Sequence, residues 1–422
     1  MSDSFVCCPF CGLLCDDLQV VQRDDRAQVA SAGCARAISL FDAPAQGQAL
    51  VAGKPVDLST ALRAAAEILQ HARRPLVGGL ACDVTGHRAA LALAERLGGV
   101  VDHMNGAAQF RNWQVFQDGG WMTTTLSEVR NRADLIVLAG VDATRFPRFF
   151  ERCLPPQSQQ PSQFGDLQRR YIVVGDKPSP TAEHPVDVAF SIPMPNQRLG
   201  DFFLALRARL AGRRVNDPVI EGVDLAQIDA LLEALRAARY GVLVWNAAEL
   251  DFPNADLTIQ AMVDLVKDLN KSTRWSGLPL GGSDGDTSAA QVCTWQTGYP
   301  LRVAFESGGP RYEPKLFATT ALLAANEVDA LVWISAFDPT RTPPVTDPEN
   351  CPSIVLGRAD MVFAEPPEVF IPVAVPGVQH GGFLHRMDAV VALPLHAPAP
   401  AQLLSVAQVL AEIQQEIPHA AA

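Results

Sequence analysis

The sequence has 422 residues, of which 48% are hydrophobic and 19% charged, and this length allows about two to four domains with well-filled cores. Its formal net charge of −12 argues against nonspecific binding to nucleic acid or to anionic lipid, but does not exclude a local basic pocket for an anionic cofactor. The segment from Met1 to Cys15 lacks the basic region and apolar core of a secretory signal. No apolar run approaches the roughly 18–20 residues of a membrane helix. We therefore expect a cytoplasmic protein that does not bind membranes.

From Leu58 onward, helical patterns alternate with short apolar runs, which predicts βα units around a largely parallel sheet. The first half contains predicted helices at 58–71 and 89–97 and predicted strands at 75–80, 134–140 and 171–175. The second half contains predicted helices at 225–238 and 257–269 and predicted strands at 241–245, 329–335 and 353–356. Residues 402–417 predict an amphipathic terminal helix. Proline and glycine at 155–161, 277–285 and 394–400 predict loops.

The two halves share a sequence pattern. Asp142-Ala-Thr-Arg145-Phe-Pro147 follows a predicted strand in the first half, and Asp338-Pro-Thr-Arg341-Thr-Pro343 follows the corresponding strand in the second. The pattern favours a duplication, although Asp and Thr also recur in unrelated loops because they cap turns well. Each arginine could bind a phosphate with two hydrogen bonds, or pair with the Asp three residues before it. Two facing α/β halves would form a crevice at the carboxyl ends of their strands, where such folds bind nucleotide-like ligands.

The nine cysteines are unevenly distributed, and five of them lie at Cys7, Cys8, Cys11, Cys15 and Cys34. An odd number, clustered at one end of a long chain, argues against a disulfide framework. Cys8, Cys11, Cys15 and Cys34 have the spacing C-x2-C-x3-C-x18-C, which could surround an iron–sulfur cluster or a zinc ion. Gly12 and Gly33 adjoin two of these cysteines and would let backbone N–H groups approach sulfur. The alternative is a set of buried, reduced thiols that pack as small apolar side chains.

Four segments resemble the B subunit of formylmethanofuran dehydrogenase. They are Cys8-Pro-Phe-Cys11-Gly-Leu-Leu-Cys15-Asp-Asp, Asn131-Arg-Ala-Asp134-Leu-Ile, Val292-Cys-Thr-Trp295-Gln-Thr-Gly298-Tyr-Pro300 and Gly381-Gly-Phe-Leu-His-Arg386-Met-Asp388, in family order. The resemblance implies an α/β fold with two pseudo-repeated parallel-sheet halves of the molybdopterin-oxidoreductase type, plus a small N-terminal cysteine-rich segment. We therefore expect a cysteine-rich segment at 1–50, a first α/β half at 51–200, a second half with pterin-site-like loops at 201–396, and a C-terminal helix at 397–422.

The resemblance also implies a metal site that this sequence does not complete. In the family, a molybdenum or tungsten ion bound by pterins takes a cysteine or selenocysteine ligand, followed by histidine, upstream of the strand that matches Asn131 to Ile136. The matching region, about 102–125, has no cysteine, and its one histidine is His103. A soft metal needs a soft ligand and a nearby acid–base group, so we expect no molybdopterin or tungstopterin. Cys82 and Cys153 lie outside the motif and could serve only in a rearranged site.

Several other residues have two interpretations. His103 and Asp102 could shuttle a proton, or form a solvent-facing loop pair. His380 and His385 lie in or beside the segment that helps to hold the pterin in relatives, but an Arg386–Asp388 pair could simply stabilise that loop. Gly281 and Gly282 indicate a flexible loop. We expect Phe110, Trp113, Phe116 and Trp121 to fill the space that a pterin would occupy, because an empty cavity is destabilising. No Gly-x-Gly-x-x-Gly, Walker, HExxH or nucleophile-elbow motif is present.

A family member without the redox ligand is similar to the B-like subunit of bacterial formyltransferase/hydrolase complexes. The resemblance implies a scaffold without activity of its own, and a complex that releases formate from a formyl-methanofuran analogue in one-carbon metabolism. It also implies amidohydrolase-like and formyltransferase partner subunits and no nucleic-acid partner. The alternatives are an active molybdenum or tungsten formylmethanofuran dehydrogenase subunit, and an iron–sulfur electron-transfer or sensor subunit that uses only Cys8, Cys11, Cys15 and Cys34. Zinc at the same cysteines would be purely structural.

Overall fold

The computed structural model describes residues 5–154, 169–176, 187–214, 219–220 and 222–418. Two compact units make up the chain: unit 1 comprises residues 1–106 and 282–422, and unit 2 comprises residues 107–281. The predicted loop at 155–161 lies outside the described residues. None of the described helices combines the length and apolar character needed to span a bilayer.

Unit 1 is built on a nine-stranded mixed sheet with the order β16-β15-β7-β6-β17-β18-β19-β4-β5. The five central strands, β7, β6, β17, β18 and β19, are parallel, and the outer strands are antiparallel. The strands are β4 (Ala49–Val51), β5 (Lys54–Val56), β6 (Pro75–Ala81), β7 (Val100–Val101), β15 (Val303–Glu306), β16 (Gly309–Tyr312), β17 (Ala330–Ser335), β18 (Ser353–Gly357) and β19 (Val369–Pro372).

Helices α12, α2 and α3 pack against one another beside this sheet, and α10 packs on α3. The helices of the unit are α1 (Ala35–Phe41), α2 (Leu58–His71), α3 (Val84–Leu97), α10 (Asp286–Thr297), α11 (Thr319–Ala324) and α12 (Val406–Glu416). Two small antiparallel sheets complete it. One contains β1 (Phe5–Val6), β2 (Leu18–Arg23) and β3 (Arg26–Ser31), and the other contains β20 (Gly382–His385) and β21 (Ala392–Leu395).

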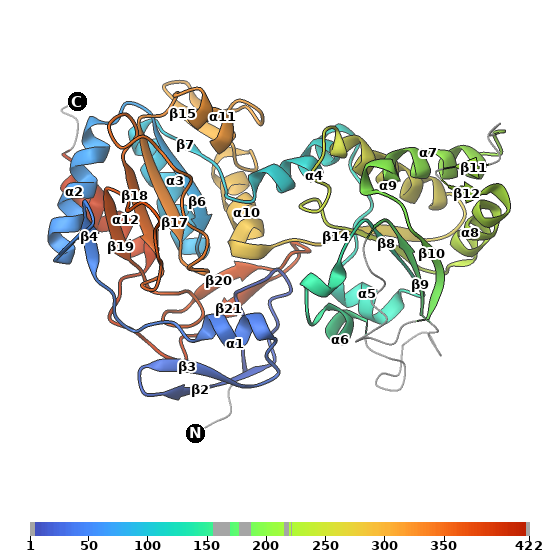
Figure 1. The fold of residues 1–422 in the computed structure, drawn as a ribbon, viewed down its shortest axis with the longest axis horizontal. Helices are drawn as coiled ribbons and strands as arrows, with labels where there is room; N and C mark the ends of the chain where they lie inside the picture. Colours follow the sequence, from blue (N-terminus) through green and yellow to red (C-terminus); the bar gives the residue numbers. More distant parts are fainter. Residues whose placement is uncertain (1–4, 155–168, 177–186, 215–218, 221, 419–422) are drawn as a thin grey trace. The chain divides into compact units, whose positions relative to one another are not determined.

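Unit 2 is built on a five-stranded, fully parallel sheet with the order β10-β9-β8-β13-β14. Its strands are β8 (Leu135–Ala139), β9 (Arg170–Val174), β10 (Val188–Ile192), β13 (Gly241–Trp245) and β14 (Trp275–Pro279). Its helices are α4 (Gly106–Gly119), α5 (Leu126–Arg132), α6 (Phe149–Cys153), α7 (Leu199–Leu210), α8 (Leu225–Ala237) and α9 (Ala255–Leu269), and a short hairpin joins β11 (Val219–Ile220) to β12 (Val223–Asp224). Helices α7 and α9 lie on one side of the sheet, and α5 and α6 on the other (Figure 1).

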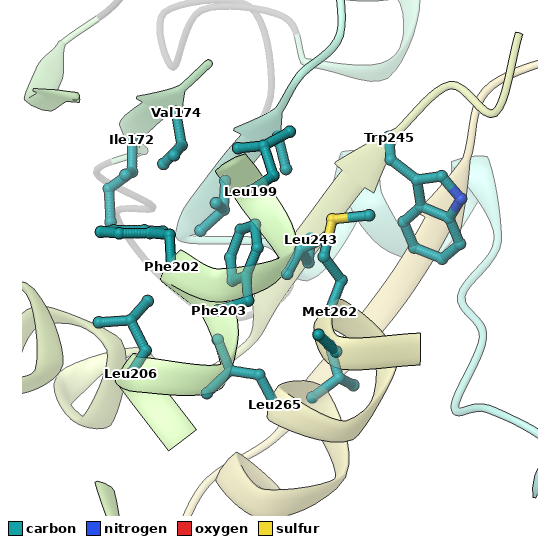
Figure 2. Close-up of a cluster of buried hydrophobic side chains, with 14 of the residues drawn as sticks. Ile172, Val174, Leu199, Phe202, Phe203, Leu206, Leu243, Trp245, Met262 and Leu265 are labelled. Carbon is teal, nitrogen blue, oxygen red and sulfur yellow. The ribbon is translucent and has the colours of Figure 1, made fainter. Parts of the chain in front are cut away.

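The core of unit 2 lies between this sheet and helices α7 and α9. Figure 2 shows Phe202, Phe203 and Leu206 of α7 beside Met262 and Leu265 of α9, with strand side chains such as Ile172 and Leu243. Strands β8 and β13 are buried along their whole length. Near-continuous apolar runs of this kind are typical of parallel strands that are covered on both faces. This burial explains why the sequence patterns predicted these strands correctly.

Most predicted elements are confirmed, with small shifts. Helix α2 and strand β13 have the predicted bounds, whereas α3 begins earlier than predicted and α12 later. The side chain of Asp83 accepts hydrogen bonds from the backbone at the start of α3, and Ser405 forms a capping box with Gln408 at the start of α12. Two of the predicted loops are partly wrong, because β14 includes Gly277 and β21 includes Pro394.

The two units do not follow the sequential boundaries 51–200 and 201–396. The first half runs α2-β6-α3-β7-α4-α5-β8-α6-β9-β10, and the second half runs α8-β13-α9-β14-α10-β15-β16-α11-β17-β18-β19. In unit 1, β6 of the first half pairs with β17 of the second, so one sheet contains β6 and β7 together with β17, β18 and β19. Unit 2 combines β8, β9 and β10 with β13 and β14. Apart from α6 in the first half and β15 and β16 in the second, the order of helices and strands is the same, but the two halves exchange strands.

In both units, an aspartate carboxylate links two strands that come from different halves of the sequence. Asp134, before β8, accepts hydrogen bonds from the backbone N–H groups of Arg239 and Tyr240, just before β13. Asp329, before β17, accepts the equivalent bonds from Arg73 and Arg74, just before β6. Each aspartate thus joins the starts of two neighbouring strands. Asp134, in the segment Asn131 to Ile136, therefore has the structural role of linking β8 to β13.

Strand exchange makes a prediction about fragments of the chain. Residues 107–281, expressed alone, are expected to fold cooperatively, because they contain every strand of the parallel sheet in unit 2 and its core. The matched control is the sequential fragment 201–396, which is expected to stay unfolded because it separates β13 from β8 and β17 from β6. Circular dichroism and urea unfolding measure both. Cooperative unfolding of fragment 201–396 would contradict the strand exchange.

Candidate functional site

The carboxyl ends of parallel strands are the expected ligand site in this type of sheet, and in unit 1 buried polar residues gather there. The residues that follow β7, Asp102 to Asn105, meet the residues before α10, Ser283 to Asp286. Arg341, in the loop after β17, contacts both segments through Asn105 and Asp284. We call Asn105, Ser283, Asp284, Asp286 and Arg341 the strand-end cluster.

Asn105 connects the members of the strand-end cluster. Its side-chain nitrogen lies 3.1 Å from Ser283 O, 3.0 Å from Ser283 Oγ and 3.3 Å from Asp286 Oδ2. Arg341 Nη2 donates to Asn105 Oδ1 over 2.6 Å, and Arg341 Nε lies 3.6 Å from Asp284 Oδ2. Arg341 thus pairs with Asp284, and the predicted ion pair between Arg341 and Asp338 is wrong. Asp338 instead accepts hydrogen bonds from the backbone and hydroxyl of Thr340.

The same turn geometry occurs at the corresponding loop of unit 2. Asp142 accepts a hydrogen bond of 3.0 Å from the backbone of Thr144, as Asp338 does from Thr340. Arg145 is exposed, and no ion pair joins it to Asp142 in the described part of the chain. The shared Asp-x-Thr pattern therefore reflects a capped turn in both loops.

His103 and Asp102 are both buried, so the expectation of a solvent-facing pair is wrong. The carboxylate of Asp102 accepts hydrogen bonds from the backbone N–H of His103, from Arg302 Nε at 3.3 Å, and from the backbone N–H and the hydroxyl of Thr319. His103 Nδ1 accepts from the backbone of Asn105 at 3.0 Å, so its Nε2 carries the proton and donates to Asp284 O at 3.1 Å. Burial lowers the pKa of His103 to about 3. The ring therefore stays neutral near pH 7 and is not placed to exchange protons with Asp102.

Burial also shifts the pKa of both carboxyl groups in the strand-end cluster. It raises the pKa of Asp284, which Arg341 partly offsets, and it raises the pKa of Asp286 to about 7. Asn105 and the hydroxyl of Thr287 hydrogen-bond to Asp286 and oppose this rise, while the nearby Asp284 adds to it. Asp286 therefore titrates near neutral pH, unlike an exposed aspartate.

The N-terminal cysteines form a tight loop on unit 1. The backbone of Cys8 donates to Cys15 O at 2.8 Å, and Leu14, in the left-handed region at φ +43°, donates to Cys11 O at 3.1 Å. Cys34 precedes α1 as its N-cap residue. Burial raises the pKa of Cys8 well above its usual value, and the nearby Cys11, Cys15 and Cys34 raise it further. The four predicted ligands therefore lie close enough to interact electrostatically.

The chemistry of this cysteine loop fits a soft metal in two respects. Burial raises the pKa of Cys11, as it does that of Cys8. The backbone of Phe10 hydrogen-bonds to the Cys8 sulfur and that of Leu13 to the Cys11 sulfur, and these bonds, with the guanidinium of Arg36 beside Cys11, oppose the rise. Such donors stabilise thiolates. However, within the described ranges no three Cys, His, Asp or Glu side chains form an arrangement that could hold a metal ion. The assignment of these cysteines as ligands therefore stays a prediction.

Two other predicted glycine and arginine features have clear structural roles. Gly282, at φ +81°, packs against the backbone of Gly12, where a Cβ would lie 2.7 Å from the Cα of Gly12. It is thus a close-approach position and not merely a flexible one, while Gly281 has open space around it. Arg386 pairs with the buried Asp388 through three contacts of 2.6–3.1 Å, as expected. The neighbouring Met387 donates to Gly12 O and so attaches this loop to the cysteine loop.

The remaining candidate residues are placed as follows. His385 contacts Trp295 edge to face at 5.3 Å, and its backbone donates to Ser288. His380 Nδ1 lies 2.6 Å from Gly381 O. Cys82 is fully buried after β6, and burial raises its pKa well above the usual value. Cys153 is buried in α6 of unit 2.

The predicted filler residues lie in unit 2. Trp113 and Phe116 of α4, with Trp121 after it, form a row of edge-to-face contacts that ends on the buried Trp245. Phe110 of α4 is also buried. Ala108 and Gln109 occupy the part of the sequence where the resemblance requires a cysteine followed by histidine. Neither side chain is a soft ligand. The residues present therefore do not fit a pterin-bound molybdenum or tungsten centre.

Comparisons with known proteins agree with the motifs. No protein-family model matches the chain. The B subunit of the tungsten-containing formylmethanofuran dehydrogenase 2 of Methanocaldococcus jannaschii is 29% identical over 399 residues, which cover 91% of each chain. The B subunit of the formyltransferase/hydrolase complex Fhc of Methylorubrum extorquens is 29% identical over 375 residues, which cover 87% of this chain and 98% of the relative. The chain is a homologue of these B subunits.

Solved structures extend this result to the fold. A chain in the crystal structure of the FhcABCD complex from Methylorubrum extorquens with methylofuran matches the present protein with a TM-score of 0.73 at 27% identity. The match covers 87% of the present protein and 98% of the Methylorubrum chain. Acetylene hydratase from Pelobacter acetylenicus matches with a TM-score of 0.65 at 11% identity, covering 98% of this chain and 69% of that one. The second match shows the fold alone. Together they confirm the expected α/β fold with parallel sheets.

Sequence reasoning missed several residues of this site. Asp284, Asp286 and Ser283 lie in a segment predicted only as a loop, and Arg302 and Thr319 bind Asp102 from about 200 residues away. The run Gly282-Ser-Asp-Gly-Asp286, with two acidic residues at the start of a helix, was the one local signal. Nothing in the sequence indicated that it would meet Asn105 and Arg341.

Proposed function

We propose that this homologue of the B subunits is a non-catalytic scaffold in a formyltransferase/hydrolase complex, which converts a formyl-methanofuran analogue to formate in one-carbon metabolism. One observation carries the proposal: the region from Asp102 to Thr125 contains no cysteine that could bind a redox metal as a thiolate. At the adjacent strand ends, Arg341 donates to Asn105 and pairs with Asp284. The match to a chain of the FhcABCD complex supports it.

Retention of such a subunit has a physical reason. Large obligate interfaces leave partner subunits with exposed apolar surface when one subunit is removed. Loss of a metal ligand abolishes redox chemistry but leaves those surfaces unchanged. The proposed partners are the amidohydrolase-like and formyltransferase subunits of the complex. The proposed role excludes molybdopterin and tungstopterin as cofactors of this chain.

We also propose that any metal bound by this chain is held by Cys8, Cys11, Cys15 and Cys34, as an iron–sulfur cluster or as zinc. The mutual electrostatic effect of the four thiols supports this assignment. Such a group would fix the cysteine loop, which is attached to the strand-end region through Gly12 and Met387. An iron–sulfur cluster would favour an electron-transfer or sensor role, whereas zinc would be structural.

Elemental analysis of the purified complex tests both proposals. We expect no stoichiometric molybdenum or tungsten. If iron or zinc is present, Cys11→Ser is expected to remove most of it, because a hydroxyl is a poor replacement for a thiolate. Cys7→Ser is the matched control and is expected to keep the metal, because Cys7 lies outside the spacing and its sulfur donates to Leu14 O.

The outcomes separate the alternatives. Molybdenum or tungsten at one atom per chain would overturn the scaffold proposal and favour the active dehydrogenase. Iron that is lost equally in Cys7→Ser and Cys11→Ser would contradict the assigned ligands. Iron lost only in Cys11→Ser, together with broad visible absorption, would favour the electron-transfer role over a simple scaffold.

A further inference from the structure

The amino ends of the parallel strands in unit 2 carry a row of arginines. Arg170 begins β9, Arg239 lies two positions before β13, and Arg274 lies directly before β14. Arg132 is the last residue of α5, which leads into β8. All four residues are exposed. We call Arg132, Arg170, Arg239 and Arg274 the arginine edge.

Backbone hydrogen bonds fix the order of this row. The N–H of Arg170 donates to Asp134 O at 2.9 Å, and the N–H of Asp134 donates to Tyr240 O at 3.2 Å. The N–H of Gly241 donates to Arg274 O at 2.9 Å. These bonds join the starts of four neighbouring strands in the order β9, β8, β13 and β14. Because neighbouring strands lie about 4.7–4.9 Å apart, the backbone of the row spans about 15 Å.

Local structural roles account for two of the four arginines. Arg132 lies in the last turn of α5, where a positive charge offsets the helix dipole, and it pairs with Glu128 at 3.1 Å. Arg239 Nε lies 3.6 Å from Asp134 Oδ2. Arg170 and Arg274 lie outside the helices, and neither side chain forms an ion pair with any residue that the structure describes. Their charges are therefore available to a binding partner.

The nearby acidic groups balance only part of the positive charge at this edge of the sheet. Asp134 and Glu128 each lie against one arginine of the arginine edge. Asp187 precedes β10, at the end of the row next to β9. Arg169, beside Arg170, adds a further positive charge. The amino ends of these strands therefore keep a local positive charge, although the formal net charge of the whole chain is −12.

We propose that the arginine edge is a docking surface for an acidic segment of a partner subunit, with carboxylates of that segment bound to Arg170 and Arg274. The inference rests on the proposed scaffold function. Charge complementarity favours this occupant, because the planar guanidinium group binds a carboxylate through two parallel hydrogen bonds. A short acidic segment contacts the arginine edge alone, whereas a long polyanion such as nucleic acid is repelled by the net negative charge of the chain.

Fluorescence anisotropy of a labelled oligo-glutamate peptide with the intact chain tests the docking surface. At about 0.1 M salt, where charges interact over about 10 Å, the unaltered protein is expected to bind this peptide but not an oligo-glutamine of equal length. The double variant Arg170→Glu/Arg274→Glu is expected to weaken binding by about tenfold or more, because two attractive charges become repulsive. The milder variant Arg170→Gln/Arg274→Gln is expected to weaken binding less, and it tests the same contacts with a smaller change in surface charge.

The matched control is Arg145→Glu/Arg198→Glu, which makes the same change in net charge at the opposite edge of the sheet. Arg145 follows β8, Arg198 follows β10, and both are exposed. This variant is expected to bind the peptide as the unaltered protein does. Equal weakening in both double variants, or no binding by the unaltered protein, overturns the proposal. Tighter binding of single-stranded DNA of equal charge would assign the surface to nucleic acid, and self-association that is lost in Arg170→Glu/Arg274→Glu would assign it to a second copy; either result overturns the proposed occupant.

Co-expression with the amidohydrolase-like and formyltransferase subunits separates this inference from the proposed function. The complex that contains Arg170→Glu/Arg274→Glu is expected to dissociate on dilution at a protein concentration about tenfold or more above that of the unaltered complex. The complex with the control variant is expected to match the unaltered one. Equal stability of all three complexes overturns the docking surface and leaves the scaffold proposal standing. If the unaltered chain forms no complex, the scaffold proposal fails, and the inference that rests on it fails with it even where the peptide binds.

Discussion

Replacing Arg302 with methionine is expected to destabilise the chain by about 3–5 kcal/mol, because it leaves the buried carboxylate of Asp102 without its cation. The two side chains are 9% and 3% exposed, and Arg302 Nε lies 3.3 Å from Asp102 Oδ1. The remaining bonds to Asp102, from Thr319 and His103, are neutral and do not balance its charge. Urea unfolding at pH 7 measures the loss in the free energy of unfolding.

The matched control is Arg311→Met. Arg311 is 50% exposed and pairs with Glu306 and Glu313 at 3.5 Å, and such surface pairs contribute about 0–1 kcal/mol. Burial already raises the pKa of Asp102, and Arg302 opposes that rise. Without Arg302 the carboxyl group becomes easier to protonate, so the deficit of Arg302→Met is expected to shrink as the pH falls. Equal losses in the two variants would show that Asp102 is not held as a buried ion.

Substitution of Gly241 by alanine is expected to have the second large effect, a loss of about 1–3 kcal/mol or more from overpacking. Gly241 opens β13 and pairs directly with Trp275 of β14. An added Cβ would overlap the indole ring of Trp275. The ring cannot swing away easily, because it is buried and its Nε1 donates to Leu235 O at 3.1 Å.

Gly281→Ala provides the comparison for this variant. A Cβ at Gly281 would meet no heavy atom within 4 Å, so the substitution is expected to change the free energy of unfolding by less than about 0.5 kcal/mol. Thermal and urea unfolding of the two variants should therefore differ clearly. If Gly241→Ala were as stable as Gly281→Ala, the pairing of β13 with β14 would have to be looser than the structure has it.

Several features of this protein were determined by the sequence alone. The buried strands β8, β13 and β17 were predicted because a parallel strand covered on both faces is apolar along its length. Helix α2 was predicted to the residue, because its apolar positions repeat at helical spacing. In the structure, the side chain of Asp57 caps its start. The missing cysteine was also visible in the sequence, because a ligand type is a property of the residue and does not depend on the fold.

Only the tertiary structure decided how these pieces combine. The exchange of strands between the two halves depends on contacts such as β6 with β17, which lie far apart in the chain and leave no local pattern. Local signals also placed His103 and Asp102 in a surface loop, whereas Arg302 and Thr319 cover them from distant positions. The state of Asp286 is the clearest case. Aspartate is ordinarily ionised, but burial at the start of α10, with Asp284 nearby, raises the pKa of Asp286 to about 7 although the hydrogen bond from Asn105 opposes this rise.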